Sequence, residues 1–226
     1  PLWDAWAFAY GPAWAADPEG FDLSPALPRS AGRIVDGASE RPVQWYFDNL
    51  LPDNEKIRGR VAARVGADGI DAYSLLAAIG RDCVGALQFL PEGSDPPRPG
   101  EIEGEPVSDR AIAKILDDLT ANPLGIDDSE HFRISLAGVQ DKTAFLRHDG
   151  QWLKPGGATP TTHIFKPPLG LVGNRQSDMR TSVENEWLCA RILHALGLPV
   201  AGCHVETFGA RKALVVERFD RQWQAD

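Results

Sequence analysis

Two lysines that follow short apolar segments are the residues of this sequence best suited to binding an anion. Lys142 ends the segment Ala137-Gly138-Val139-Gln140-Asp141-Lys142, which lies between two segments of strand-like composition. A strand, a glycine-bearing loop and a second strand can present backbone N–H groups to a phosphate. Lys166 ends the strand-like segment 162–165 and is a second candidate phosphate partner. The loop matches neither GxxxxGK[ST] nor GxGxxG, so an ordinary hairpin connection explains it equally well.

A lysine that holds a nucleotide phosphate needs a carboxylate to fix it, and the predicted helix after Thr181 contains two. Glu184 has the capping-box spacing from Thr181, which predicts a local structural role. Glu186 shares an apolar helix face that we expect to point at the sheet, with Cys189, Ala190 and Leu193. Because an inward glutamate is costly unless paired, we expect Glu186 to pair with Lys166. A solvated lysine at a strand end is the alternative.

Two further segments flank these residues. Ser135 precedes the glycine-bearing loop and reads first as a local hydrogen-bonding residue. Phosphorylation of Ser135 would instead add negative charge beside the lysines and expel or reorder the loop. Glu217-Arg218-Phe219 follows an apolar strand. On its own, this charged segment indicates a solvated strand end.

Composition narrows the class of protein. With 43% hydrophobic and 24% charged residues, the 226-residue chain is typical of a soluble globular protein with one large or two small domains. A net charge of −9 argues against direct binding to nucleic acid or an anionic membrane.

Three scattered cysteines without a CxxC pair indicate a reducing cytoplasm. The five histidines lack metal-ligand spacing, so we expect no metal site. No segment has the length of a membrane helix and no signal peptide is recognisable; a start at Pro1 suggests a longer gene product.

The elements that must position these residues fall into two halves. Helical patterns cover 45–51, 54–65 and 71–79, and a strand-like segment covers 85–90. The Pro-, Gly- and acid-rich stretch 91–106 is the best linker candidate, which predicts domains at 1–107 and 108–226. Ser108 then caps a helix, and a helix follows Thr181. Strand patterns are predicted at 132–136, 143–146, 151–153, 162–166, 203–208 and 213–217, with a loop at 167–180. This order predicts an α+β fold with an antiparallel sheet and one prominent helix, the order of parts in a protein-kinase N-lobe.

Several long motifs resemble the HipA family of serine/threonine-kinase toxins. RISLAGVQDKTAFL, TPTTHIFKPP, SVENEWLCARILHALGLPV and VVERFDRQW carry the resemblance in the second half. WYFDNLLPDNEKIRGRV and IGRDCVGALQFLPEG resemble the N-terminal subdomain of the same family. The resemblance implies a kinase-like N-lobe preceded by a HipA-type N-terminal α/β subdomain.

The resemblance also implies an activity and partners. The family's cofactors are ATP and Mg²⁺, and a protein serine receives the phosphoryl group, with glutamyl-tRNA synthetase, an aminoacyl-tRNA synthetase, a known type of target. The implied setting is the bacterial cytoplasm and a role in persistence, with a small DNA-binding antitoxin, HipB, as partner and corepressor. By position, the loop from Ala137 to Lys142 would bind phosphates, Lys166 would hold them, and Glu217, Arg218 and Phe219 would form the hinge at the adenine. Ser135 would be the autophosphorylation site.

Two departures from the family pattern matter. An additional N-terminal strand segment is missing before Pro1. The catalytic aspartate, the metal-binding asparagine and the second metal-binding aspartate would lie beyond Asp226, so no catalytic or metal-binding residue is assigned and the chain alone is expected to be inactive. A non-catalytic module that docks the antitoxin or a full-length toxin is the alternative. A kinase-like parent with a small-molecule or lipid substrate is a third reading.

Overall fold

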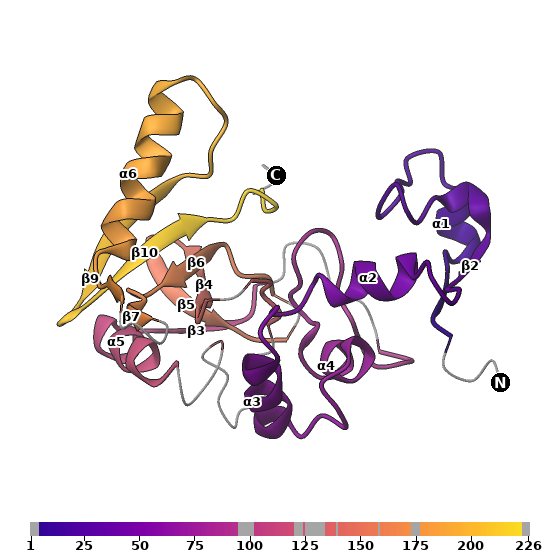
Figure 1. Cartoon of the computed structure of the whole chain (residues 1–226), viewed down its shortest axis with the longest axis horizontal. Coiled ribbons are helices and arrows are strands. Elements are labelled where there is room, and N and C mark those ends of the chain that lie inside the picture. Colours follow the sequence, from indigo (N-terminus) through magenta and orange to yellow (C-terminus); the bar gives the residue numbers. More distant parts are fainter. Residues whose placement is uncertain are drawn as a thin grey trace.

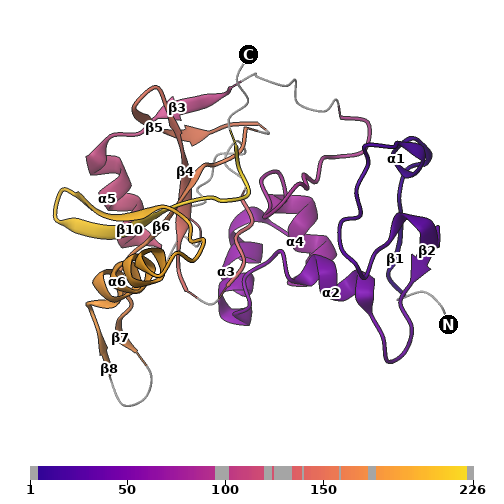
Figure 2. The same ribbon diagram turned by 90° about the horizontal axis from the view of Figure 1, so that it is seen from above.

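The computed structural model describes residues 5–94, 102–119, 124, 134–138, 140–157, 159–172 and 177–222. Three parts follow one another along the long axis of the molecule (Figure 1). A small N-terminal hairpin region lies at one end, a group of helices occupies the middle, and a sheet with two helices lies at the other end. Figure 2 shows the same order of parts from above.

The N-terminal region is small and rich in aromatic contacts. Strand β1 (Ala7–Ala9) pairs antiparallel with β2 (Arg33–Val35), and the connection contains helix α1 (Pro12–Ala16) and the 3₁₀ turn η2 (Arg29–Ala31). The Phe8 ring packs against Phe47 of the helical group, with ring centroids 5.8 Å apart. This aromatic contact ties the hairpin to the helices.

The middle part contains helices α2 (Pro42–Asp48), α3 (Glu55–Val65) and α4 (Ala72–Ile79). Side chains cap two of these helices: the Asn54 side chain accepts from the N–H groups at the start of α3, and the Asp71 side chain accepts from the N–H of Ser74 at the start of α4. The predicted helices 54–65 and 71–79 are confirmed. Helix α2 begins and ends about one turn earlier than predicted, because Pro42 is well suited to the first helical turn.

The segment 85–90 was expected to be a strand, and this prediction is wrong. Gly85 has φ +77, and its N–H donates to the carboxylate of Asp220 instead of to a neighbouring strand. Gly80, at the end of α4, has φ −78 and is not in the left-handed region. A Cβ at Gly80 would lie 2.7 Å from the Phe89 ring, so close approach rather than backbone conformation requires glycine there.

The second half forms one six-stranded antiparallel sheet with the order β3-β5-β4-β6-β10-β9. Its strands are β3 (Gly104–Pro106), β4 (Thr143–His148), β5 (Gln151–Pro155), β6 (His163–Lys166), β9 (Cys203–Phe208) and β10 (Arg211–Glu217). The predicted domain boundary at 107 falls just after β3, so the sheet begins upstream of that boundary. In the predicted loop 167–180, a short hairpin of β7 (Gly170–Val172) and β8 (Ser177–Met179) is present.

Two helices lie on the sheet. Helix α5 (Asp109–Asp118), capped by Ser108 as predicted, buries Ile112 and Leu116 against one face, among aromatic side chains that include Phe145, Phe165 and Phe208. Burial of each such side chain contributes about 1.5–3 kcal/mol. Helix α6 (Ser182–Ala195), predicted to follow Thr181, contacts β9 and β10. The antiparallel sheet with a prominent helix confirms the predicted α+β class.

Two groups of buried apolar side chains hold these parts together. One unites the N-terminal helices with Ile134, Leu136 and Ala144, so the segment before the glycine-bearing loop packs on the helical part. Ile134 and Leu136 belong to no strand, and Phe132 lies outside the described residues. Among the described helices, none is long and apolar enough to cross a membrane.

Candidate functional site

Lys166 and Glu186 form the ion pair expected from the sequence. Lys166 is the last residue of β6, and its Nζ donates to Glu186 Oε1 of α6 over 2.6 Å. The side chains are 24% and 45% exposed, so the pair is accessible from solvent. The prediction that Glu186 points into a buried helix–sheet interface is wrong. In α6 only Val183 is buried, and apolar side chains occur on every side of the helix.

Glu184 does not form the predicted capping box. The Thr181 side chain makes no capping hydrogen bond at the start of α6. The Glu184 carboxylate accepts a hydrogen bond from Lys212 of β10 instead, and this bond lowers the pKa of Glu184. The lysine on the facing strand therefore competes successfully with the helix terminus for this carboxylate.

The glycine-bearing loop closes on its own lysine. The Lys142 ammonium donates to the carbonyl of Ala137, and Lys142 is only 7% exposed. Burial, followed by the charge of Lys166, lowers the pKa of Lys142, although nearby carboxylates oppose the shift. Gly138 has φ +105, and a Cβ there would lie 2.6 Å from the Lys142 Nζ. The loop conformation therefore needs glycine at this position.

Two polar contacts tie the same loop to its surroundings. Gln140 Nε2 donates to the carbonyl of Pro167, directly after Lys166, over 2.9 Å. Asp141 pairs with Arg60 of α3 at 3.1 Å. Val139, predicted as part of the loop, lies outside the described residues. The loop is thus held between the end of β6 and the helical part, with its lysine directed back into it.

Ser135 lies at the interface between the sheet and the helical part. It is fully buried, its Oγ donates to the carbonyl of Leu50 over 2.6 Å, and its N–H donates to the carbonyl of Asp82 over 3.0 Å. In this conformation the hydroxyl is out of reach of any phosphate donor. Ser135 is a hydrogen-bonding residue, but its partners Leu50 and Asp82 are distant in the sequence, so the predicted local role is wrong. Its modification stays a prediction.

The predicted hinge segment separates into exposed and buried residues. Glu217 is exposed at the end of β10, and Phe219 is 87% exposed. The Arg218 side chain is 1% exposed and pairs with Asp82 and Asp220. Its N–H donates to the carbonyl of Thr162, and its carbonyl accepts from Arg221. We therefore assign Arg218 to holding the segment in place rather than to contacting a ligand.

The sequence did not indicate the buried charged network around Arg218. Its other members include Asp82 and Thr161, whose side chains hydrogen-bond each other at 2.7 Å. Nothing in the local pattern joins residues 136 positions apart, as Asp82 and Arg218 are. The one available signal was the density of charged residues directly after an apolar strand.

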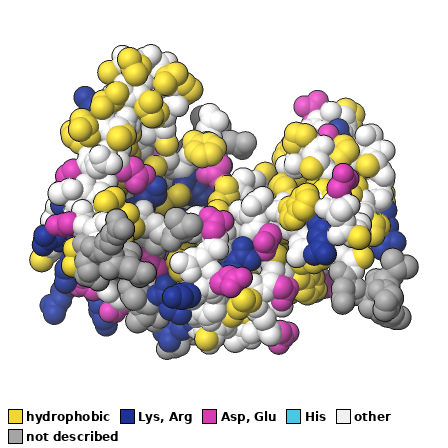
Figure 3. Space-filling model, in the orientation of Figure 1, with side chains coloured by type: hydrophobic (Ala, Val, Ile, Leu, Met, Phe, Trp, Pro, Cys, Tyr) yellow, Lys and Arg dark blue, Asp and Glu magenta, His cyan; other side chains and the backbone are white. Residues whose placement is uncertain are grey.

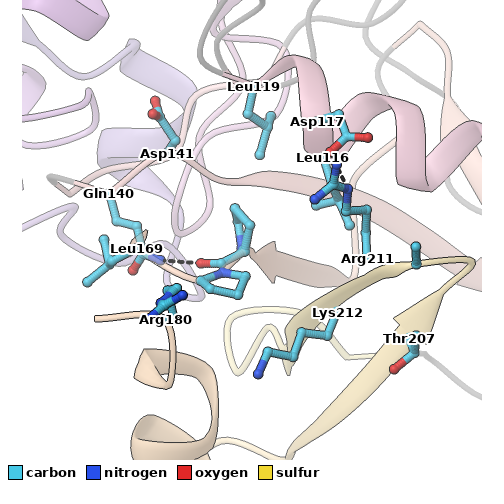
Figure 4. A pocket seen from close by; sticks show the side chains of 13 residues that line it. Leu116, Asp117, Leu119, Gln140, Asp141, Leu169, Arg180, Thr207, Arg211 and Lys212 are labelled. Carbon is cyan, nitrogen blue, oxygen red and sulfur yellow. Dashed lines mark hydrogen bonds and ion pairs between the residues drawn. The ribbon is translucent and has the colours of Figure 1, made fainter. Parts of the chain in front are cut away.

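A polar pocket of about 670 Å³ opens beside the loop, between α5, the segment after β6 and the β9–β10 hairpin (Figure 4). Arg180, Arg211 and Lys212 line it together with Asp117 and Asp141. Arg211 pairs with Asp117 at 2.5 Å, and the other two cations also have acidic partners. Each of the three cations that line the pocket is therefore already paired with a carboxylate. Among the side chains that the structure describes, no cluster of His, Cys, Asp or Glu could hold a metal ion.

The sheet, the helix α6 and the lysine–glutamate pair between them define a kinase-like N-lobe. Two family models match the chain: the HipA N-terminal domain over residues 3–90 and the HipA-like C-terminal domain over residues 134–226. The chain belongs to the HipA family.

Individual relatives agree with this assignment. Y4mE of Sinorhizobium fredii, whose name is putative kinase Y4mE, is 36% identical over 97% of this chain and 50% of its own length. The serine/threonine-protein kinase toxin HipA of Shewanella oneidensis is 30% identical over 97% of this chain and 46% of its own length. A solved complex of Shewanella oneidensis HipA with HipB and operator DNA matches with a TM-score of 0.67, 30% identity, and coverage of 96% of this chain and 46% of that chain. The chain spans about half the length of these relatives.

Proposed function

We propose that this chain is the ATP-binding half of a HipA-like serine/threonine kinase that transfers a phosphoryl group from Mg-ATP to a protein serine and to itself. The observation that carries the proposal is the ion pair of Lys166 and Glu186 at 2.6 Å. The buried Lys142 ammonium is a second cation of the same site, and its pKa is lowered first by burial and then by the charge of Lys166. Two ammonium groups beside a glycine-bearing loop fit the phosphates of a nucleotide.

Each residue has a distinct role in this proposal. Lys166, oriented by Glu186, holds the phosphates, and Lys142 reaches them when it leaves the Ala137 carbonyl. The loop from Ala137 to Lys142 supplies backbone N–H groups, and Glu217 and Phe219 border the adenine. Bound ATP supplies the phosphoryl group, and Mg²⁺ neutralises its charge. The base and the metal ligands would come from outside this chain, so the chain alone binds nucleotide without catalysis.

Ser135 is the proposed site of autophosphorylation. A phosphate dianion does not fit where the Ser135 hydroxyl is fully buried against the Leu50 carbonyl. Modification therefore requires the loop to leave this position, and the modified loop does not return. This order of events makes phosphorylation of Ser135 an off-switch for nucleotide binding.

The proposed partner is a HipB-like antitoxin, with which the protein acts as a corepressor. Support comes from the solved relative, a complex of HipA, HipB and operator DNA. A net charge of −9 favours DNA contact through the antitoxin rather than through this chain. The proposed acceptor is a serine of an aminoacyl-tRNA synthetase, the glutamyl-tRNA synthetase type, in the bacterial cytoplasm.

One observation favours a second candidate, a non-catalytic module that docks the antitoxin or a full-length toxin. Large apolar side chains are exposed on α6 and at the residue that follows it: Trp187, Leu188, Ile192, Leu193 and Leu196. Figure 3 shows hydrophobic side chains gathered over this part of the molecule. Such a surface is typical of one that another protein chain covers. An antitoxin or a full-length toxin docked on α6 would cover it.

Calorimetric titration of this chain with Mg-ATP tests the first proposal, with Glu184→Gln as a control that leaves the Lys166 pair intact. Saturable binding supports the ATP-binding half; absence of binding, together with capture of a purified HipB-like antitoxin, supports the docking module. Labelled ATP is then added with the complete gene product to a cell extract, which distinguishes a protein acceptor from a small-molecule or lipid acceptor. Label in protein supports a protein kinase, whereas label in small molecules or lipids overturns that choice.

A further inference from the structure

A buried network of charged side chains joins the helical part to the segment that leaves β10. Arg218 lies at its centre with a side chain 1% exposed, between Asp82 Oδ2 at 3.0 Å and Asp220 Oδ2 at 2.8 Å. Its guanidinium also donates to Thr161 Oγ1 and to the carbonyl of Cys83, each over 2.8 Å. Asp82 comes from the turn after α4, so the network crosses between the two halves of the molecule.

In this junction, the turn 82–85 and the segment 218–221 each donate hydrogen bonds to the other. Arg221 donates to Asp82 Oδ1 over 2.8 Å and to the carbonyl of Gly85 over 2.8 Å. In return, the N–H of Gly85 donates to Asp220 Oδ2 over 2.8 Å. The turn 82–85 and the segment 218–221 thus hold each other through both backbone and side-chain groups.

A network of this kind specifies one geometry. The buried carboxylate of Asp82 accepts from Arg218, Arg221 and both the N–H and hydroxyl groups of Thr161. Buried charges that are fully bonded tolerate little displacement, because any movement leaves a charge unpaired in a poorly solvated place. Phe219, 87% exposed, lies between Arg218 and Asp220, both of which are bonded into this network.

The backbone of Asp82 makes a second tie. Its carbonyl accepts from the N–H of Ser135 over 3.0 Å, at the start of the segment that leads into the glycine-bearing loop. One residue of the helical part therefore touches both borders of the proposed nucleotide site. Its side chain holds the segment that carries Phe219, and its backbone holds the segment that carries Gly138.

We propose that Asp82 is a positioning residue for nucleotide binding: the turn 82–85 of the N-terminal half fixes the hinge segment 217–221 where the adenine is read. The inference rests on the proposed ATP site and adds a residue of the N-terminal half to it. In this proposal, the kinase-like lobe needs the helical part because the helical part positions the hinge segment of the lobe. Asp82 touches no ligand and acts through Arg218.

The test compares two parts of the nucleotide in the complete gene product. A fluorescent ATP analogue is displaced by adenosine, which reports on the hinge, or by inorganic tripolyphosphate, which reports on the lysines. The variants are Asp82→Asn and Thr161→Val, which remove the charge or one hydroxyl at nearly constant shape. Asp48→Asn is the matched control, because it changes an Asp–Arg pair within the helical part, where Asp48 meets Arg58 at 2.7 Å.

The proposal predicts that both variants bind adenosine about tenfold more weakly, the size of effect expected from one or two displaced hydrogen bonds. Tripolyphosphate affinity and the control stay at wild-type values. A general loss of packing would weaken both ligands equally and would overturn the positioning role. If Asp82→Asn does not fold, Thr161→Val decides.

Failure of this inference is distinguishable from failure of the proposed function. If adenosine affinity is unchanged in folded variants while Lys166→Ala abolishes displacement by tripolyphosphate, the ATP site stands and the role of Asp82 is refuted. If the wild-type protein binds no ATP analogue, the proposed function fails, and this inference fails with it.

Discussion

Lys166 on β6 donates from its Nζ to Glu186 Oε1 on α6 over 2.6 Å. Glu184, two residues earlier on the same helix, pairs with Lys212 instead. Both pairs are partly exposed. An exposed pair of this kind contributes little to folding, because solvent screens the two charges. The two glutamates therefore offer matched substitutions, alike in stability and different in their relation to the proposed phosphate site.

Glu186→Gln should weaken Mg-ATP binding about tenfold or more, because the Lys166 ammonium loses the charged partner that orients it. Glu184→Gln should leave ATP affinity within about twofold, since it changes only the exposed ion pair between Glu184 and Lys212. Calorimetric titration of both variants checks this. Equal affinities for the two variants would show that the Lys166 pair has no part in binding.

Gly138→Ala should reduce ATP affinity, because a Cβ at φ +105 is strained and would meet the Lys142 ammonium at 2.6 Å. Gly150→Ala is the control: Gly150 has φ +74 in the β4–β5 turn, with nothing within 4 Å of its added Cβ. Both variants should lose about 1 kcal/mol of unfolding free energy or more. Only Gly138→Ala should lose nucleotide affinity, and unaltered affinity there would argue against a phosphate loop.

Ser135→Asp should drive the loop out of its buried position, because a carboxylate cannot be accommodated against the Leu50 carbonyl. We expect faster hydrogen exchange in 134–142 and weaker ATP binding. Ser135→Ala, which loses a single hydrogen bond, should cost about 1 kcal/mol and keep the loop in place. An aspartate variant with full ATP affinity would refute the proposed switch.

Acid should weaken the junction around Arg218. Burial raises the pKa of Asp220, but the hydrogen bonds from Arg218 and Gly85 and the charges of Arg218 and Arg221 outweigh it and lower the pKa to about 2. The folded state thus binds this proton less readily than the unfolded state does, and stability rises with pH. The contribution is complete above about pH 4 and is lost as pH falls to about 2.

Urea unfolding between pH 4 and pH 2 checks this dependence. Wild-type protein should lose unfolding free energy across that range, and Asp220→Asn should show a smaller loss. The same slope in both proteins would mean that Asp220 is not held ionised by the junction.

Short-range features of this fold could be predicted from the sequence. Asn54, Asp71 and Ser108 cap their helices because each side chain bonds to backbone groups two or three residues away. Lys166 and Glu186 could be paired because a strand end and the next helix leave few other partners for them. Loop closure by Lys142 onto Ala137 was not predicted, although all its atoms lie within one short segment.

Other features depend on distant residues. Asp82 and Arg218 are brought together by the packing of two halves, and no local pattern encodes that contact. The segment 85–90 has strand-like composition, yet the bond from Gly85 to Asp220 takes the N–H that a strand would need. The buried face of α6 could not be predicted correctly, because apolar residues occur on all sides of the helix and only Val183 is buried.

The most direct test of the central claim is phosphate incorporation by the complete gene product with labelled Mg-ATP, in wild type and in Lys166→Ala. The account predicts labelling of Ser135 in the wild-type protein and none in Lys166→Ala, with Lys212→Ala, which breaks the neighbouring pair, labelled as the wild type. Undiminished labelling of folded Lys166→Ala would contradict the account and would move the nucleotide site elsewhere.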